Sequence, residues 1–96
     1  YTGALEDFTK IIELDPEYTM AYSYRGLSKL SLEDFSGAVT DFTKAIELDP
    51  EYADYYYFRG EAHQRLGSLN DACSDWKKAA ELGDVDAGKL VTENCQ

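Results

Sequence analysis

Apolar residues recur at helical spacing along almost the whole chain, and short polar breaks separate the runs. Between residues 19 and 48 two such runs, 21–32 and 35–48, are divided by Glu33-Asp34, and Asp49-Pro50 ends the second run. It ends there because the residue before a proline is pushed out of the helical region. The pattern returns at 53–66 and 69–82 around a Gly67-Ser68 break, and we expect Gly83 to form a left-handed cap.

One further helical run stands at each end of the chain. The first covers Gly3 to Leu14, and at the other end Asp84 can cap a short helix at 85–94. The chain is therefore predicted to be all-α, with six short amphipathic helices. Because each helix is short, it depends on its neighbours for stability.

The chain repeats itself with a period of 34 residues. The segment 3–18 (GALEDFTKIIELDPEY) aligns with 37–52 (GAVTDFTKAIELDPEY), and most positions are identical. The same register aligns residues further along: Tyr22, Arg25 and Gly26 with Tyr56, Arg59 and Gly60, and Ala38, Asp41 and Phe42 with Ala72, Asp75 and Trp76. Chance does not produce this agreement over so much of a chain, so we expect a stack of helical repeats.

These residues resemble the tetratricopeptide repeat. Its pattern has an aromatic, Leu-Gly and Tyr in a first helix, Ala, an aromatic and Ala in a second, and then Pro. The two full copies here hold Tyr22, Arg25-Gly26, Ala38, Phe42, Ala45 and Pro50, and Tyr56, Arg59-Gly60, His63, Ala72, Trp76 and Ala79. The resemblance covers essentially the whole chain and implies an α-solenoid of antiparallel helix pairs in a right-handed superhelix. It divides a single domain, 1–96, into a half repeat (1–18), full repeats at 19–52 and 53–84, and a capping helix (85–96).

Two features of the repeat predict how its helices pack. Gly26 and Gly60 lack a side chain where the paired helix must come close. Arg25 and Arg59 stand where the pattern has Leu, and an Asp precedes each second-helix aromatic: Asp7, Asp41 and Asp75. We expect Arg25 to pair with Asp7 or Asp41, and Arg59 with Asp41 or Asp75. The alternative is that all five point into water, where such pairs contribute little.

The charge balance narrows the classes of partner. Nine basic residues against 19 acidic ones give a formal net charge of −10. Such a surface repels nucleic-acid backbones and anionic membranes, so apolar or basic partners are expected; the alternative is that the charge only keeps the domain soluble. No apolar run approaches the roughly 20 residues of a membrane span. Because the sequence opens at Tyr1 in mid-repeat, we expect it to be a fragment of a longer protein.

The two cysteines and the one histidine do not indicate a metal site. Cys73 and Cys95 form no CxxC pair, and only His63 could join them as a ligand. We expect free, partly buried thiols, with a single disulfide as the alternative. We expect neither a metal nor a cofactor.

The resemblance also implies where a partner binds. First helices line the concave side of the family's superhelix, and the inner positions here are Ser23, Leu27, Leu30, Tyr57, Glu61 and Gln64, with Met20 and Asp54 at the rim. One subgroup of the family holds acidic chaperone tails there through Lys and Asn, which are absent from the matching positions. The surface therefore suits an apolar or basic peptide, unless two first helices make too small a groove.

The first helix has no preceding partner, which predicts self-association. Leu5, Phe8 and Ile12 belong to its apolar face, and we expect a homodimer or a domain-swapped contact through this end.

No catalytic constellation is present in the sequence. A single His gives no triad, and Gly26 and Gly60 are isolated within helices, so they form no phosphate loop. We therefore predict a non-catalytic protein-interaction module. Two alternatives stay open: a structural segment that drives self-assembly of a longer array, and an accessory segment of a larger enzyme.

Overall fold

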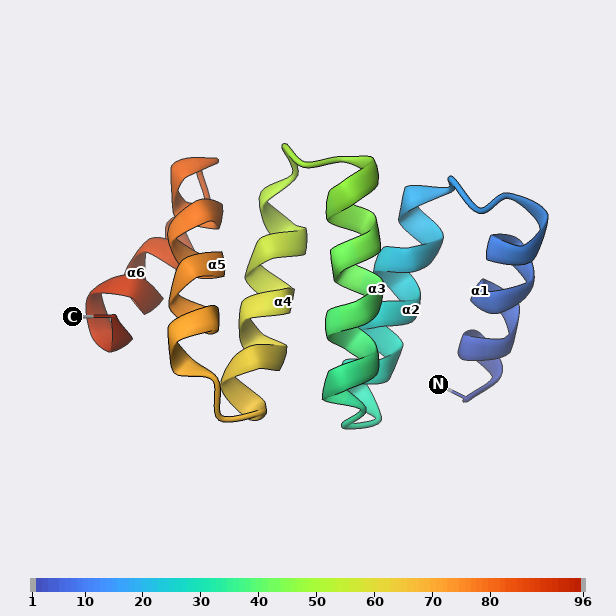
Figure 1. Cartoon of the computed structure of the whole chain (residues 1–96), viewed down its shortest axis with the longest axis horizontal. Coiled ribbons are helices and arrows are strands. Elements are labelled where there is room, and N and C mark those ends of the chain that lie inside the picture. The colour runs from blue at the N-terminus through green and yellow to red at the C-terminus, as the bar shows by residue number, and fades with distance from the viewer. Residues whose placement is uncertain (1, 96) are drawn as a thin grey trace.

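Six helices follow one another in the computed structural model, which describes residues 2–95. They are α1 (Thr2–Leu14), α2 (Thr19–Ser31), α3 (Phe35–Leu48), α4 (Ala53–Arg65), α5 (Leu69–Glu81) and α6 (Val85–Asn94). Successive helices run in alternating directions, and each contacts the next, so the chain forms a row with its termini at opposite ends (Figure 1). The predicted all-α solenoid is confirmed. Within the described residues, no helix is long and apolar enough to cross a bilayer.

The helix boundaries follow from local chemistry. The side chain of Asp34 accepts a hydrogen bond from the Gly37 amide (3.0 Å), and that of Asp84 accepts one from the Ala87 amide (3.2 Å). Two glycines after helices have left-handed backbones, Gly67 (φ 83°) and the predicted cap Gly83 (φ 107°). Glu33 occupies the same conformation (φ 63°) without being a glycine, which the sequence pattern did not indicate.

Two hydrophobic clusters lie between the helices and hold them together. The first is centred on Tyr22, Phe42 and Tyr55, and the second on Tyr56 and Trp76. The predicted close approaches are confirmed, because a Cβ atom on Gly26 would lie 2.9 Å from the Phe42 ring and one on Gly60 would lie 2.6 Å from Trp76 Nε1. Glycine is therefore required where each first helix crosses the aromatic of its second helix.

Cys73 and Cys95 form a disulfide, so the expectation of free thiols is wrong. Cys73 lies in α5, and Cys95 directly follows the last residue of α6. The two helices pack against each other and bring the Cα atoms of the cysteines to 5.7 Å, within the range that a disulfide bridges. The sequence separation of 22 residues gave no sign of this, because the contact depends on how α6 folds back onto α5.

Candidate functional site

The predicted inner positions lie on two neighbouring helices, α2 and α4. On α2, Ser23, Leu27 and Leu30 are half-buried, and the two leucines pack against the first hydrophobic cluster. On α4, Tyr57 and Glu61 are half-buried, whereas Asp54 and Gln64 are exposed. Much of the leucine surface therefore serves the core, and α4 offers the polar groups that a partner would meet. Met20, at the rim, is 43% exposed.

Tyr57 is fixed at the junction of α4, α5 and α6. Its carbonyl oxygen accepts a hydrogen bond from Trp76 Nε1 (3.3 Å), and its ring lies edge-on to Phe58 with 5.3 Å between the ring centres. Burial and the carboxylates of Glu61, Asp86 and Asp84 raise the pKa of Tyr57. The phenol thus stays protonated at neutral pH and is surrounded by negative charge from α4 and α6.

The cations of α2 are occupied in ion pairs with α3. Arg25 donates from Nε and Nη2 to the two carboxylate oxygens of Asp41, at 2.9 and 2.7 Å, and Lys29 Nζ lies 3.1 Å from the same carboxylate. Asp41 is 1% exposed. The hydrogen bond to Asp41 is the main cause that raises the pKa of Arg25, so the guanidinium stays charged. Both cations of α2 are therefore held by one buried carboxylate.

The same bridge recurs one repeat later. Arg59 donates to both carboxylate oxygens of Asp75, at 2.9 and 2.7 Å, and His63 Nε2 lies 3.8 Å from that carboxylate. The predicted Arg–Asp pairing is thereby confirmed, with Asp41 and Asp75 as the partners. The third aspartate, Asp7, is exposed and belongs to no ion pair among residues 2–95.

Each arginine also reaches the preceding second helix, which the sequence reasoning missed. Arg25 Nη1 donates to Thr9 Oγ1 at 3.3 Å, and Arg59 Nη1 donates to Thr43 Oγ1 at 3.2 Å. One guanidinium therefore joins three consecutive helices. The sequence did contain a sign of this contact: Thr9 and Thr43 are 34 residues apart, and so are Arg25 and Arg59.

A second group of polar residues missed in the sequence lies between α2 and α4. Electrostatic interactions connect Tyr52 and Tyr55 there with Tyr24, Asp49 and Asp54, and we call these five residues the tyrosine cluster. The rings of Tyr52 and Tyr55 meet edge-on, with their centres 4.8 Å apart. Tyr24 also stacks on Phe8 of α1 at 5.5 Å.

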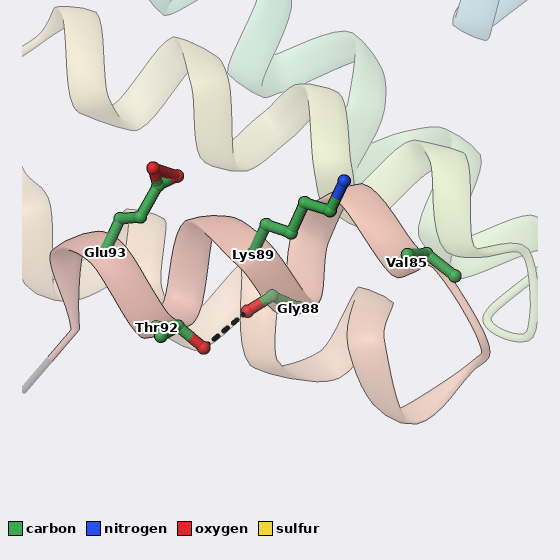
Figure 2. A pocket seen from close by; sticks show the side chains of 5 residues that line it. All are labelled: Val85, Gly88, Lys89, Thr92 and Glu93. Carbon is green, nitrogen blue, oxygen red and sulfur yellow. Dashed lines mark hydrogen bonds between the residues drawn. The ribbon is translucent and has the colours of Figure 1, made fainter.

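Each of the two end helices lines a hollow on the surface of the array. On α1, the hollow is lined by Leu5, Glu6, Thr9, Lys10 and Glu13. Of the residues predicted to self-associate, Phe8 stacks on Tyr24 and Ile12 packs on the first hydrophobic cluster, which leaves Leu5 at the hollow. Figure 2 shows the hollow on α6, which is lined by Val85, Gly88, Lys89, Thr92 and Glu93. Lys89 and Glu93 extend to one side of the helix, and Thr92 Oγ1 donates to the Gly88 carbonyl.

Comparisons with known proteins identify the architecture. A family model described as TPR repeat matches residues 26–67. The second TPR of Spaghetti (RPAP3), bound to the HSP90 peptide SRMEEVD, is 32% identical and has a TM-score of 0.83, with 85% of this chain and 76% of that chain covered. No curated protein sequence matches the chain.

Two further solved domains are similar over nearly the whole chain. The second TPR domain of human RPAP3, in complex with the HSP70 peptide SGPTIEEVD, is 28% identical with a TM-score of 0.88, and 96% of this chain and 78% of that chain are covered. The TPR domain of OM64 from Arabidopsis is 26% identical with a TM-score of 0.89, and 95% and 77% are covered.

Proposed function

Because this chain belongs to the tetratricopeptide repeat family, we propose that it is a non-catalytic interaction module that binds a peptide or protein partner on its concave face. The observation that carries the proposal is the arrangement of α2 and α4. Their packing residues hold the helices rigidly through the Arg–Asp bridges, and other side chains of the same helices remain open to solvent. A rigid surface of this kind binds a partner without losing much conformational entropy.

The partner is apolar or basic rather than an acidic chaperone tail. Two similar domains bind peptides that end in EEVD, and such tails require cations in the groove. In this chain Arg25, Lys29 and Arg59 are paired with buried carboxylates. The positions open to a partner carry the neutral Tyr57 and the carboxylates of Asp54 and Glu61, and these carboxylates repel an acidic peptide and attract a basic one.

A peptide series tests this proposal. Labelled seven-residue peptides with lysine, leucine or glutamate at alternate positions, together with SRMEEVD, are titrated with the chain and followed by fluorescence anisotropy. We expect the lysine and leucine peptides to bind and both acidic peptides to show no saturable binding. Glu61→Lys is expected to weaken binding of the lysine peptide, while Glu13→Lys, at an exposed position of α1, serves as the matched control. Tight binding of SRMEEVD would contradict the specificity.

A second candidate function is self-association through α1. Leu5 lines the hollow on this helix and Leu14 is 88% exposed, so α1 carries uncovered apolar surface. We expect light scattering to show a concentration-dependent dimer that Leu5→Glu abolishes and Val85→Glu at the other end preserves. A wild-type chain that stays monomeric at every concentration would rule this candidate out.

A further inference from the structure

Tyr55 occupies a helix position where the other repeats carry a small residue. It is the third residue of α4, and the third residues of α2 and α6 are Ala21 and Ala87. All three are buried, with exposed fractions of 3%, 2% and 0%. The repeat therefore packs with alanine at this position, and the tyrosine is a departure specific to the junction of α2 and α4.

The hydroxyl of Tyr55 lacks the partner that a buried phenol normally has. The packing tyrosines Tyr22 and Tyr56 donate to the carbonyl oxygens of Pro16 and Pro50, each at 2.9 Å. Tyr55 is more deeply buried, yet its hydroxyl makes no hydrogen bond to any residue in the described range 2–95. Buried polar groups are normally hydrogen-bonded, so this exception requires an explanation.

The Tyr55 hydroxyl opens to the surface rather than into the core. No enclosed side-chain nitrogen or oxygen among the described residues lacks a hydrogen-bond partner, so an unpaired hydroxyl must reach solvent. Its ring is embedded in the first hydrophobic cluster beside Phe42 and Ala45. The oxygen is therefore held in a fixed position where an external donor can meet it.

The groups around this hydroxyl have the chemistry of a cation site. Tyr24 and Tyr52 are 43% and 48% exposed, so their rings are accessible. Asp49 and Asp54 are exposed, and neither belongs to an ion pair in the described part of the chain. The ring of Tyr52 meets that of Tyr55 with 4.8 Å between their centres, and Asp54 directly precedes Tyr55 in α4. Burial raises the pKa of Tyr55, and the charges of Asp49, Tyr52, Tyr24 and Asp54 add to this increase.

We propose that the tyrosine cluster seats one lysine or arginine side chain of the peptide partner. The Tyr55 oxygen accepts a hydrogen bond from an ammonium or guanidinium N–H, and the two aspartates balance the charge. The exposed rings of Tyr24 and Tyr52 add cation–π attraction. This anchor rests on the proposed function, because it assumes that a peptide lies across α2 and α4, and it specifies which residue of that peptide determines recognition.

The junction between α4 and α6 lacks the equivalent cluster. Counting from the first residue of each helix, Tyr55 is replaced in α6 by Ala87, and the position of Tyr24 in α2 is taken in α4 by Phe58. Neither carries a hydroxyl. The chain therefore has one such anchor among its described residues, and binding is expected to depend on a single cation at a fixed place in the peptide.

The test uses peptides that differ in one side chain. A labelled Gly-Ala-Leu-Ala-X-Ala-Leu-Ala-Gly carries lysine, arginine, norleucine or glutamate at X and is titrated with the intact oxidised chain. We expect the lysine and arginine peptides to bind about tenfold more tightly than the norleucine peptide, since cation–π and charge contributions of this size add. Asp54→Asn and Tyr55→Phe should remove most of that advantage, because they weaken the lysine and arginine peptides much more than the norleucine peptide.

Matched variants distinguish the loss of the anchor from a general change in charge and from a loss of folding. Asp86→Asn alters the equivalent second residue of α6, and Tyr18→Phe alters the residue 34 positions before Tyr52. Both should keep the full lysine advantage. Because Asp54 is exposed, its variant is expected to fold, and circular dichroism checks this for each protein. Equal affinities of the lysine and norleucine peptides, or an equal loss for both in Asp54→Asn, would overturn the anchor.

A small probe distinguishes failure of the anchor from failure of the proposed function. Acetyl-lysine methylamide is titrated into the chain while the tyrosine ring signals are followed by NMR, with acetyl-norleucine methylamide as the reference. Lysine-specific shifts at Tyr24, Tyr52 and Tyr55 support the anchor even if no nine-residue peptide binds, which would count against the peptide-binding function alone. Peptide binding without lysine-specific ring shifts supports the function and refutes the anchor.

Discussion

Helices α1 and α6, at the two ends of the array, each have one face that no helix of the described chain covers. The two helices differ in which of the helix-pairing residues they retain. In α4, Tyr56, Arg59 and Gly60 contact the paired helix, and the equivalent residues of α6 are Gly88, Val91 and Thr92. The aromatic, the cation and the glycine are all gone, so α6 cannot form the bridge that joins α4 to α5.

Helix α1 retains the aspartate of the Arg–Asp pairs. Asp7 stands where Asp41 and Asp75 accept their arginines, yet it is exposed and has no ion-pair partner in the described chain. The α6 end is instead closed by the disulfide to α5 and by the Asp84 cap. Helix α6 has therefore lost the residues that pair helices and is linked covalently to α5. Helix α1 still carries Asp7, the residue that pairs with an arginine in the other repeats.

The largest expected effect is at the disulfide. Replacing both Cys73 and Cys95 by alanine should lower the free energy of unfolding by about 3 kcal/mol, because the 22-residue loop between them is released in the unfolded chain. Urea denaturation measures this change. Amide exchange in α6 should then become as fast as in α1. Unchanged stability would show that packing alone holds α6 in place.

The repeated aspartate should contribute much more to the free energy of unfolding in the interior than at the α1 end. Asp41→Asn removes the charge facing Arg25 and Lys29 and is expected to cost about 2 kcal/mol, in the range for hydrogen bonds to charged groups. Asp7→Asn is the matched control and should stay within about 0.5 kcal/mol of the wild type. Thermal or urea unfolding compares the two, and equal losses would contradict the assignment of Asp7 as unpaired.

The effect of replacing a helix glycine by alanine should reverse its sign between the interior and the α6 end, where the expected change in stability is small. Gly26→Ala would place a Cβ atom 2.9 Å from the Phe42 ring, so we expect it to lower the free energy of unfolding by about 1–3 kcal/mol. Gly88→Ala meets no atom within 4 Å and should raise that free energy by about 0.5–1 kcal/mol, as alanine does in an open helix position. A stabilised Gly26→Ala protein would show that the close approach is not needed.

The repeat register predicted most of the fold because it combines local and long-range information. Helix boundaries follow from Asp34, Pro50, Gly83 and Asp84, whose backbone preferences are local. The Arg25–Asp41 bridge was predictable because a residue pattern repeated after 34 positions must recur in the same environment. Glu33 was not predictable in this way, because an acidic residue in a left-handed conformation departs from the glycine found at the matching turn, Gly67.

The candidate site was less accessible to sequence reasoning. The disulfide depends on how α6 packs on α5, which no local pattern of Cys73 or Cys95 indicates. Tyr55 falls within the predicted helical run 53–66, and a helical pattern does not show whether a hydroxyl has a partner. The available signal was the contrast with Ala21 and Ala87, which appears only when the helices are aligned by their first residues.

The most direct test of the account is to map where a peptide binds. Backbone amide shifts of the ¹⁵N-labelled chain are followed by NMR as the nine-residue lysine peptide is added. We predict the largest amide shifts on α2 and α4, at Ser23, Asp54, Tyr57 and Glu61. Little change is expected at Leu5 and Val85, which lie in the two end helices. Shifts confined to the outer faces of α1 or α6 would contradict binding on the concave face.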